Sequence, residues 1–517
     1  MKLLSLIFVP VMRKLLGGSA GYSVFASANE VFAFVYVLTT AGLPVAISKL
    51  VTELTAVGNL RQARQAFRMA RSVMLLMGIL FTILLAAFAK PIAAVMNNAE
   101  SWMGILFIAP TILICSILSA YRGYLQGLKN MTPTAVSQVA EQFVHVAVSI
   151  GMVILLRDQG IIWAVAGASS GTAAGALVAL LIVLRFYKRQ EAELHVRVKS
   201  PVRNESRMTA KAILRKLIYY SIPITISSGI QYGGNMVDAS ILLGRLEAGG
   251  FEKEVAKGLY GDMMATRQLL NVPASLVTAL CISLLPTVAA LYAQQKKQET
   301  VDKINYCYKL CFLVAVPCAV ALTVFSGPVY TLLGFGENHM LLCYMAFSII
   351  LMAIVHLQST VMQSVNRLFT ATVFMGISVV VKAVLNYILV AVPGLNVYGA
   401  ILSTYISYLI PLCLNYYVLT RKMHLKISLF RHLSSPGLAA GLMTAAAVPV
   451  FLLLQRLFGG ISVAYIANAL ALLPAAFVGA AVYFLSLRKL GGLTDEDLKA
   501  IYPRALRGRT ASRGVEE

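Results

Sequence analysis

Residues 103–125 read MGILFIAPTILICSILSAYRGYL, an apolar stretch in which Arg122 is the one charged residue. A helix crosses the hydrocarbon core of a bilayer with about 20 apolar residues, so this stretch is long enough to span it. The rest of the chain is similar: of its 517 residues, 59% are hydrophobic and 13% are charged, and the mean hydropathy is +0.78. A water-soluble fold cannot bury that much apolar surface, so the sequence predicts an integral membrane protein.

Apolar runs of this length recur and are separated by polar or basic stretches. Lipid-exposed backbone must satisfy its own hydrogen bonds, and the runs are too long and too apolar for barrel strands, so we expect α-helices. Arg13 and Lys14 lie between the first apolar stretch and the small residues GGSAG (17–21), which favours a short first span over a cleaved signal peptide. About fourteen spans are expected, at 3–16, 24–46, 72–96, 103–125, 134–156, 161–184, 217–243, 259–292, 306–333, 341–362, 370–392, 398–419, 438–457 and 464–487.

The loops between these runs differ in their basic residues. With the amino terminus in the cytoplasm, the inner loops and tail hold thirty-two Lys and Arg residues, and the outer loops hold six. Because Lys and Arg concentrate in cytoplasmic loops, we expect a cell-membrane protein with both termini cytoplasmic. Arginines also repeat every three or four residues in NLRQARQAFRMARSV (59–73), and this stripe is expected to contact anionic headgroups of membrane lipids.

The net charge of +23 does not indicate nucleic acid as a partner. The basic residues lie at the ends of apolar runs and do not form a face interleaved with aromatic residues. The seven cysteines lie mostly inside apolar segments, without CxxC or His-rich spacing. Neither a disulfide framework, a metal site nor a cofactor is therefore expected.

A long basic loop at 185–216 divides the chain into two sets of six expected helices, and the two sets look related. When their fifth helices are aligned, His145 falls against Lys382 and Ser149 against Asn386. Because six is an even number, two such repeats are related by an axis along the membrane normal and enclose a central cavity.

Ionisable side chains inside spans are the candidates for function, because each costs on the order of 2.5 to 3.5 kcal/mol to place in hydrocarbon. Such groups are expected to face protein or a water-filled cavity. Arg267 and Glu30 lie at similar depth on the eighth and second spans, so they are expected to face each other. A cationic cavity for an anionic substrate and internal ion pairs between helices are both open interpretations. The candidates are Glu30, Glu141, His145, Asp238, Asp262, Arg267, His356 and Lys382.

Four stretches of the chain are informative: YRGYLQGLKNMTPTAVSQVAEQ (121–142), TTAGLPVAISKLVTEL (39–54), RQLLNVPASLVTALCISLLPTVAALYA (267–293) and VKAVLNYILVAVPGLNVYGAILSTYISY (381–408). They resemble the polysaccharide transporter branch of the MOP exporter superfamily, and within it the stage V sporulation protein B and MurJ-like lipid II flippases. The resemblance implies an all-α polytopic fold of two pseudo-symmetric six-helix lobes with two carboxy-terminal helices. The implied parts are an N-lobe at 1–184, a cytoplasmic linker at 185–216, a C-lobe at 217–420, helices thirteen and fourteen at 421–487 and a cytoplasmic tail at 488–517.

The resemblance also implies a cationic central cavity for a diphosphate-sugar head and an apolar groove for its polyprenyl tail. Arg267 matches a cavity arginine on helix eight, and Lys2 falls where helix one carries a basic cavity residue in the family. The chain departs from the family pattern in its short first helix, in His145 at a position that is often basic, and in helix two, which lacks paired arginines. The smaller cationic inventory leaves other lipid-linked saccharides open besides lipid II.

The sequence therefore predicts a flippase that moves a polyprenyl-diphosphate-linked saccharide from the inner to the outer leaflet by alternating access. The protein is expected to act as a monomer. Membrane potential, H⁺ and Na⁺ gradients remain open as its driving force, as does a vegetative or a sporulation role. The residues expected to line the substrate cavity are Arg267, Lys382, Glu30, Glu141, His145, Lys2 and Asn386.

The alternative hypothesis is a multidrug exporter of the MATE type that exchanges Na⁺ or H⁺ for organic cations. Such a protein is expected to have an acidic cavity and twelve helices, whereas this chain has Arg267, Lys382 and two further spans. An enzyme is not expected, because the longest outer loop, 244–258, is about fifteen residues and is too short to carry a catalytic site.

Overall fold

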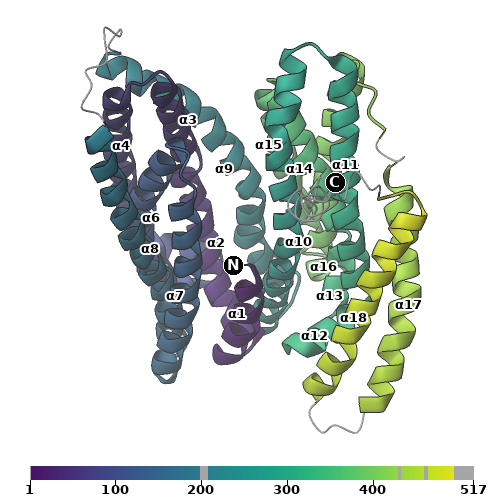
Figure 1. The fold of residues 1–517 in the computed structure, drawn as a ribbon. Helices are drawn as coiled ribbons and strands as arrows, with labels where there is room; N and C mark the ends of the chain where they lie inside the picture. Colours follow the sequence, from purple (N-terminus) through teal and green to yellow (C-terminus); the bar gives the residue numbers. More distant parts are fainter. Residues whose placement is uncertain (1, 198–207, 429–431, 459–463, 494–517) are drawn as a thin grey trace, which may run out of the picture. The chain divides into compact units, whose positions relative to one another are not determined.

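The computed structural model describes residues 2–197, 208–428, 432–458 and 464–493 (Figure 1). This part of the chain is built from α-helices joined by short turns, and it contains no strand. Its helices are α1 (Lys2–Leu15), α2 (Ser19–Thr40), α3 (Gly42–Ala56), α4 (Leu60–Ala87), α5 (Ala89–Val95), α6 (Trp102–Gly127), α7 (Thr132–Leu156), α8 (Ile161–Arg197), α9 (Ala210–Ala248), α10 (Lys253–Ala293), α11 (Lys297–Val324), α12 (Ser326–Leu333), α13 (Met340–Ala346), α14 (Ser348–Ser364), α15 (Leu368–Leu389), α16 (Asn396–Tyr417), α17 (Ser434–Phe458) and α18 (Ala464–Lys489).

All fourteen expected spans fall on these helices, and four of the spans each cover two helices. Proline explains three of these breaks, because its ring has no N–H for the carbonyl four residues earlier. The helices α2, α4 and α11 each end four residues before a proline, at Thr40, Ala87 and Val324. The sequence therefore determines where these helices break.

Twelve helical segments of the described residues are long and apolar enough to cross a membrane. The expected spans at 3–16 and 217–243 are helical but lie outside this set. The first, α1, has only fourteen residues, and α9 interrupts its apolar sequence with polar residues that include Gln231, Asn235 and Asp238. The predicted class, an all-α polytopic membrane protein, is confirmed.

The chain forms two compact units. The first unit comprises Met1–Val272 and Arg367–Leu414, and the second comprises Pro273–Asn366 and Asn415–Glu517. The helix α10 thus contributes its first half to one unit and its second half to the other. The lobe boundaries expected from the sequence stay predictions, and 198–207 and 494–517, within the expected linker and tail, lie outside the described residues.

In the first unit, α9 packs along α2 and α3 on one side and against α15 on another. Gly42 permits a close approach of α3 to α9, because an added Cβ would overlap the backbone carbonyl of Ser221. Gly261 does the same for α10, where a Cβ would overlap the carbonyl of Ser19 at the start of α2. These contacts bring α2, α9, α10 and α15 together around the charged residues described below.

The second unit has its own apolar core. Phe325 and Phe451 pack edge to face with ring centroids 5.7 Å apart, and Ala471, Leu472 and Ala475 of α18 complete this core. Figure 1 shows α17 and α18 running side by side, and the two helices are in contact along their length.

Candidate functional site

Five of the residues singled out from the sequence meet in the first unit, and we call them the central cluster: Glu30, Asp238, Arg267, Lys382 and Asn386. Arg267 donates from Nη1 to Asp238 Oδ2 at 2.7 Å and from Nη2 to Glu30 Oε1 at 3.1 Å. Lys382 Nζ lies 2.7 Å from Asp238 Oδ2, and Asn386 Nδ2 donates to Asp238 Oδ1 at 2.7 Å. The expected approach of Arg267 to Glu30 is therefore a direct ion pair.

Helix geometry explains how α9 and α15 build their part of the central cluster. Side chains four residues apart lie on the same helix face. Lys382 and Asn386 are one turn apart on α15 and both contact Asp238 on α9, and Lys382 also donates to the carbonyl of Gly234, one turn before Asp238, at 3.2 Å. Packing of α9 against α15 thus places two donors on one carboxylate.

The central cluster is buried and electrically balanced. The side chain of Asp238 is 1% exposed, and those of Lys382, Glu30 and Arg267 are 9%, 10% and 14% exposed. Two carboxylates face two cations, so their formal charges cancel. Such pairing offsets much of the cost of holding ions away from water.

A row of ion pairs extends from the central cluster toward the start of α10. Asp262 Oδ1 lies 2.6 Å from Arg13 Nη2 of α1, and it accepts a hydrogen bond from Ser19 at 2.6 Å. Lys257 Nζ lies 2.7 Å from Glu100 Oε2, in the short turn before α6. The row Lys257, Asp262 and Arg267 covers about 15 Å of helix. Each member pairs with a residue from the first hundred positions of the chain.

Glu141 and His145 lie elsewhere in the first unit. Glu141 Oε2 accepts from Arg122 Nη2 at 2.8 Å, and Arg122 also donates to Ser137. His145 Nδ1 lies 3.3 Å from the hydroxyl of Thr172, on α8. Among the contacts of the described residues, none joins Glu141 or His145 to the central cluster.

Two further candidates are set apart. His356 lies on α14, partly buried, in the second unit. Lys2 begins α1, but its side chain lies outside the part of the chain that the structure describes. Its cavity role stays a prediction.

Sequence reasoning missed the roles of three basic residues. Arg13, Arg122 and Lys257 are not among the site candidates drawn from the sequence, yet all three are buried and paired. A signal for Arg122 was present, because it lies inside the apolar run 103–125. The row along α10 had no comparable signal, since it depends on which helices become neighbours.

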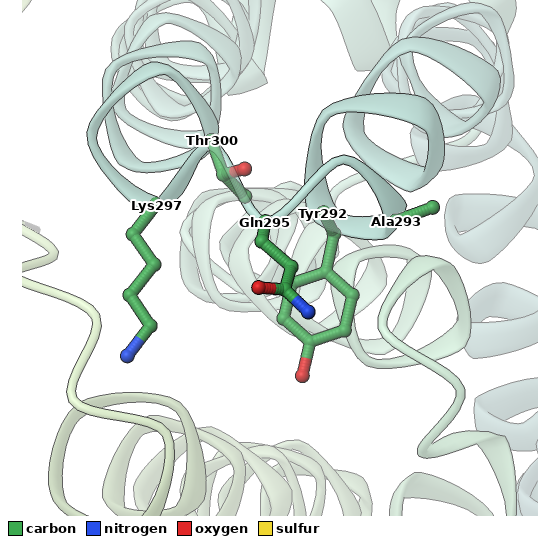
Figure 2. Close-up of a pocket in the computed structure, with 5 residues that line it drawn as sticks. All are labelled: Tyr292, Ala293, Gln295, Lys297 and Thr300. Carbon is green, nitrogen blue, oxygen red and sulfur yellow. The ribbon is translucent and has the colours of Figure 1, made fainter.

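The second unit contains a pocket of about 400 Å³ at the turn between α10 and α11, lined by Tyr292, Ala293, Gln295, Lys297 and Thr300. Figure 2 shows the Lys297 side chain extending on one side of this pocket and the Tyr292 and Gln295 side chains on another. None of the predicted site residues lines it.

Solved structures define the class of this fold. The lipid II flippase MurJ, in an inward closed conformation, matches with a TM-score of 0.65 and 13% identity, covering 95% of this chain and 97% of that one. A multidrug resistance MATE family transporter of the MOP superfamily, in an inward-facing conformation, also gives a TM-score of 0.65 and 13% identity, covering 81% of this chain and 96% of that one. The protein therefore has the fold of the MOP-superfamily transporters.

The chain belongs to the polysaccharide biosynthesis protein family, whose model matches residues 1–292. Among relatives from Bacillus subtilis (strain 168), the uncharacterized membrane protein YabM is 28% identical over 505 residues, which is 97% of this chain and 92% of that protein. Stage V sporulation protein B is 28% identical over 393 residues, covering 75% and 74% of the two chains. Lipid II flippase MurJ is 24% identical over 503 residues, covering 92% and 90%. The resemblance inferred from the sequence is confirmed.

Proposed function

We propose that this protein is a flippase that moves a polyprenyl-diphosphate-linked saccharide, lipid II or a related cell-wall precursor, to the outer leaflet by alternating access. The observation that carries the proposal is the central cluster, which holds a guanidinium and an ammonium at depth within a membrane protein. Two of its relatives bear the names lipid II flippase and sporulation protein. In a transporter of an anionic lipid-linked precursor, the buried cations Arg267 and Lys382 would bind the anionic group of the substrate.

In this proposal Arg267 and Lys382 bind the diphosphate. The planar guanidinium of arginine presents several donors in a fixed fork that suits phosphate oxygens. Lys382 adds a second positive charge, and Asn386 adds an amide to the same side of the site. Glu141, His145 and Lys2 would contact other parts of the substrate. The substrate enters from the cytoplasm, where both termini lie, and one copy of the chain suffices.

Complementation of cells depleted of their lipid II flippase tests the proposal. We expect the parent chain to restore growth, and we expect Arg267→Ala and Lys382→Ala to reach the membrane in normal amount without restoring it. Arg157→Ala is the matched control, since Arg157 is 53% exposed at the end of α7. Normal rescue by Arg267→Ala would show that Arg267 does not bind the diphosphate. Failure of the parent chain to rescue would show that its substrate is a precursor other than lipid II.

A multidrug exporter of the MATE type is the second candidate function, because MATE structures share the fold and the central cluster includes two carboxylates. Cells that express the protein are then expected to accumulate less of a fluorescent organic cation such as ethidium. Under the flippase proposal, ethidium accumulation stays the same with the parent chain and with Glu30→Gln.

A further inference from the structure

The two carboxylates of the central cluster are held very differently. Asp238 has both oxygens occupied: Arg267 and Lys382 contact Oδ2, and Asn386 contacts Oδ1, each at 2.7 Å. Its side chain is 1% exposed. Charge-assisted hydrogen bonds of this length are among the stronger ones in proteins. Asp238 is therefore fixed in place.

In the part of the chain that the structure describes, Glu30 is held by one side-chain hydrogen bond. Among the described residues, its hydrogen-bond partner is Arg267, through the longer 3.1 Å bond from Nη2 to Oε1. The Glu30 side chain is 10% exposed, and that of Arg267 is 14% exposed. Glu30 also comes from α2, whereas Asp238, Lys382 and Asn386 come from the packed pair α9 and α15. Removing Glu30 from Arg267 leaves the other contacts of the central cluster intact.

The net charge of the central cluster depends on whether Glu30 is in contact with Arg267. With Glu30 in contact, the central cluster is formally neutral and does not attract an anion. Without Glu30, Arg267 and Lys382 face Asp238 alone, and the site carries one net positive charge. One donor nitrogen of Arg267, Nη2, is then free for a new acceptor, while Nη1 is still oriented by Asp238.

We propose that Glu30 is an internal competitor of the substrate: its carboxylate occupies Arg267 in the empty protein and is displaced by the diphosphate group. Asp238 is the positioning residue that keeps Arg267 and Lys382 aimed during the exchange. This inference rests on the proposed function, and it adds that the affinity of the site for anions is set by a carboxylate of the protein itself. The competitor keeps the cations paired while no substrate is bound.

The experiment measures binding of inorganic diphosphate to the purified full chain in detergent by titration calorimetry. Glu30→Gln removes the competing charge and keeps the shape of the side chain. Because Glu30→Gln turns a charge-assisted contact with Arg267 into a weaker neutral one that diphosphate displaces more easily, we expect it to bind diphosphate at least about tenfold more tightly than the parent. A purely structural role of Glu30 would give weaker binding, so the gain in affinity separates the two.

Controls make the outcome specific. Glu53→Gln changes a half-exposed carboxylate of α3 that lies near Lys216, and it is expected to leave the diphosphate affinity unchanged. Arg267→Ala, combined with Glu30→Gln, should abolish the gain. Glu30→Asp, whose shorter side chain holds Arg267 less well, is a second variant and should give a smaller gain. A polyprenyl diphosphate in place of inorganic diphosphate shows whether the gain extends to the lipid-linked form.

The outcomes separate this inference from the proposed function. If the parent binds diphosphate and Glu30→Gln binds it no more tightly, the competitor role is wrong and the flippase proposal stands. If neither protein binds inorganic or polyprenyl diphosphate, both are wrong. Tighter binding by Glu30→Gln that persists in the Arg267→Ala double variant also rejects the competitor role, because the gain then arises at another site.

Discussion

Replacing Asp238 with asparagine is the most direct test of how the central cluster stabilises the fold. Asparagine keeps the size of the side chain but removes its charge, so Lys382 loses its carboxylate partner while 9% exposed. Asp238 accepts two hydrogen bonds from charged groups, each contributing about 1.5–3 kcal/mol. Leaving one member of a buried ion pair unpaired costs about 3–5 kcal/mol. We therefore expect Asp238→Asn to lower the free energy of unfolding by about 3–5 kcal/mol.

Reversible unfolding of the purified protein in mixed detergent micelles, followed by circular dichroism as SDS is added, measures this free energy. The double variant Asp238→Asn with Lys382→Met removes both charges and leaves the Arg267–Glu30 ion pair. It should recover about 0.5–3 kcal/mol, the usual range of coupling between contacting residues. Asp158→Asn, at a carboxylate that is 86% exposed, is the control and should change nothing measurable. An Asp238→Asn protein as stable as the parent would refute the reasoning, because buried charge would then have no cost here.

Three further predictions test other parts of the structure. Gly261→Ala should lower the free energy of unfolding by about 1–3 kcal/mol in the same assay, because the added Cβ overlaps backbone at the start of α2; an unchanged value would mean that α10 and α2 are further apart. The sulfur atoms of Cys281 and Cys311 are 3.9 Å apart, so copper phenanthroline should oxidise them to a disulfide. Intact mass measures this disulfide, which should be absent in Cys281→Ser. If the parent forms no disulfide, the contact between α10 and α11 at these residues is wrong. Arg122→Gln should cost about 1–3 kcal/mol, since it leaves the partly buried Glu141 without its ion pair; Glu141→Gln in the same background should return part of this loss, and no return would show that the pair contributes little.

The helices were predictable because the bilayer imposes a single strong constraint on sequence. Each expected span is helical, and three of the four spans that contain a break have it four residues before a proline. The break at Phe347, between α13 and α14, has no proline four residues after the end of α13. Local chemistry therefore accounts for most of the helix boundaries.

From the sequence we could predict that Arg267 and Glu30 meet, but not the contacts of Asp238. Distance from the end of a span gave Arg267 and Glu30 the same depth, and they form an ion pair. The role of Asp238 as the shared acceptor was not foreseen, because it depends on α9 packing against α15, whose residues are far apart in sequence. Sequence gives the height of a side chain along its helix, whereas neighbours across helices come from tertiary packing.

The polar character of α9 has a consequence for how the protein is made. This helix lies outside the set that is apolar enough to cross a membrane by itself, and Asp238 would be a bare charge in lipid while the nascent chain emerges. Its partner Arg267 follows 29 residues later, on the next helix, and its partner Lys382 follows 144 residues later, on α15. The buried charge of α9 is thus neutralised in stages during synthesis, and its full set of contacts forms only when α15 packs against α9.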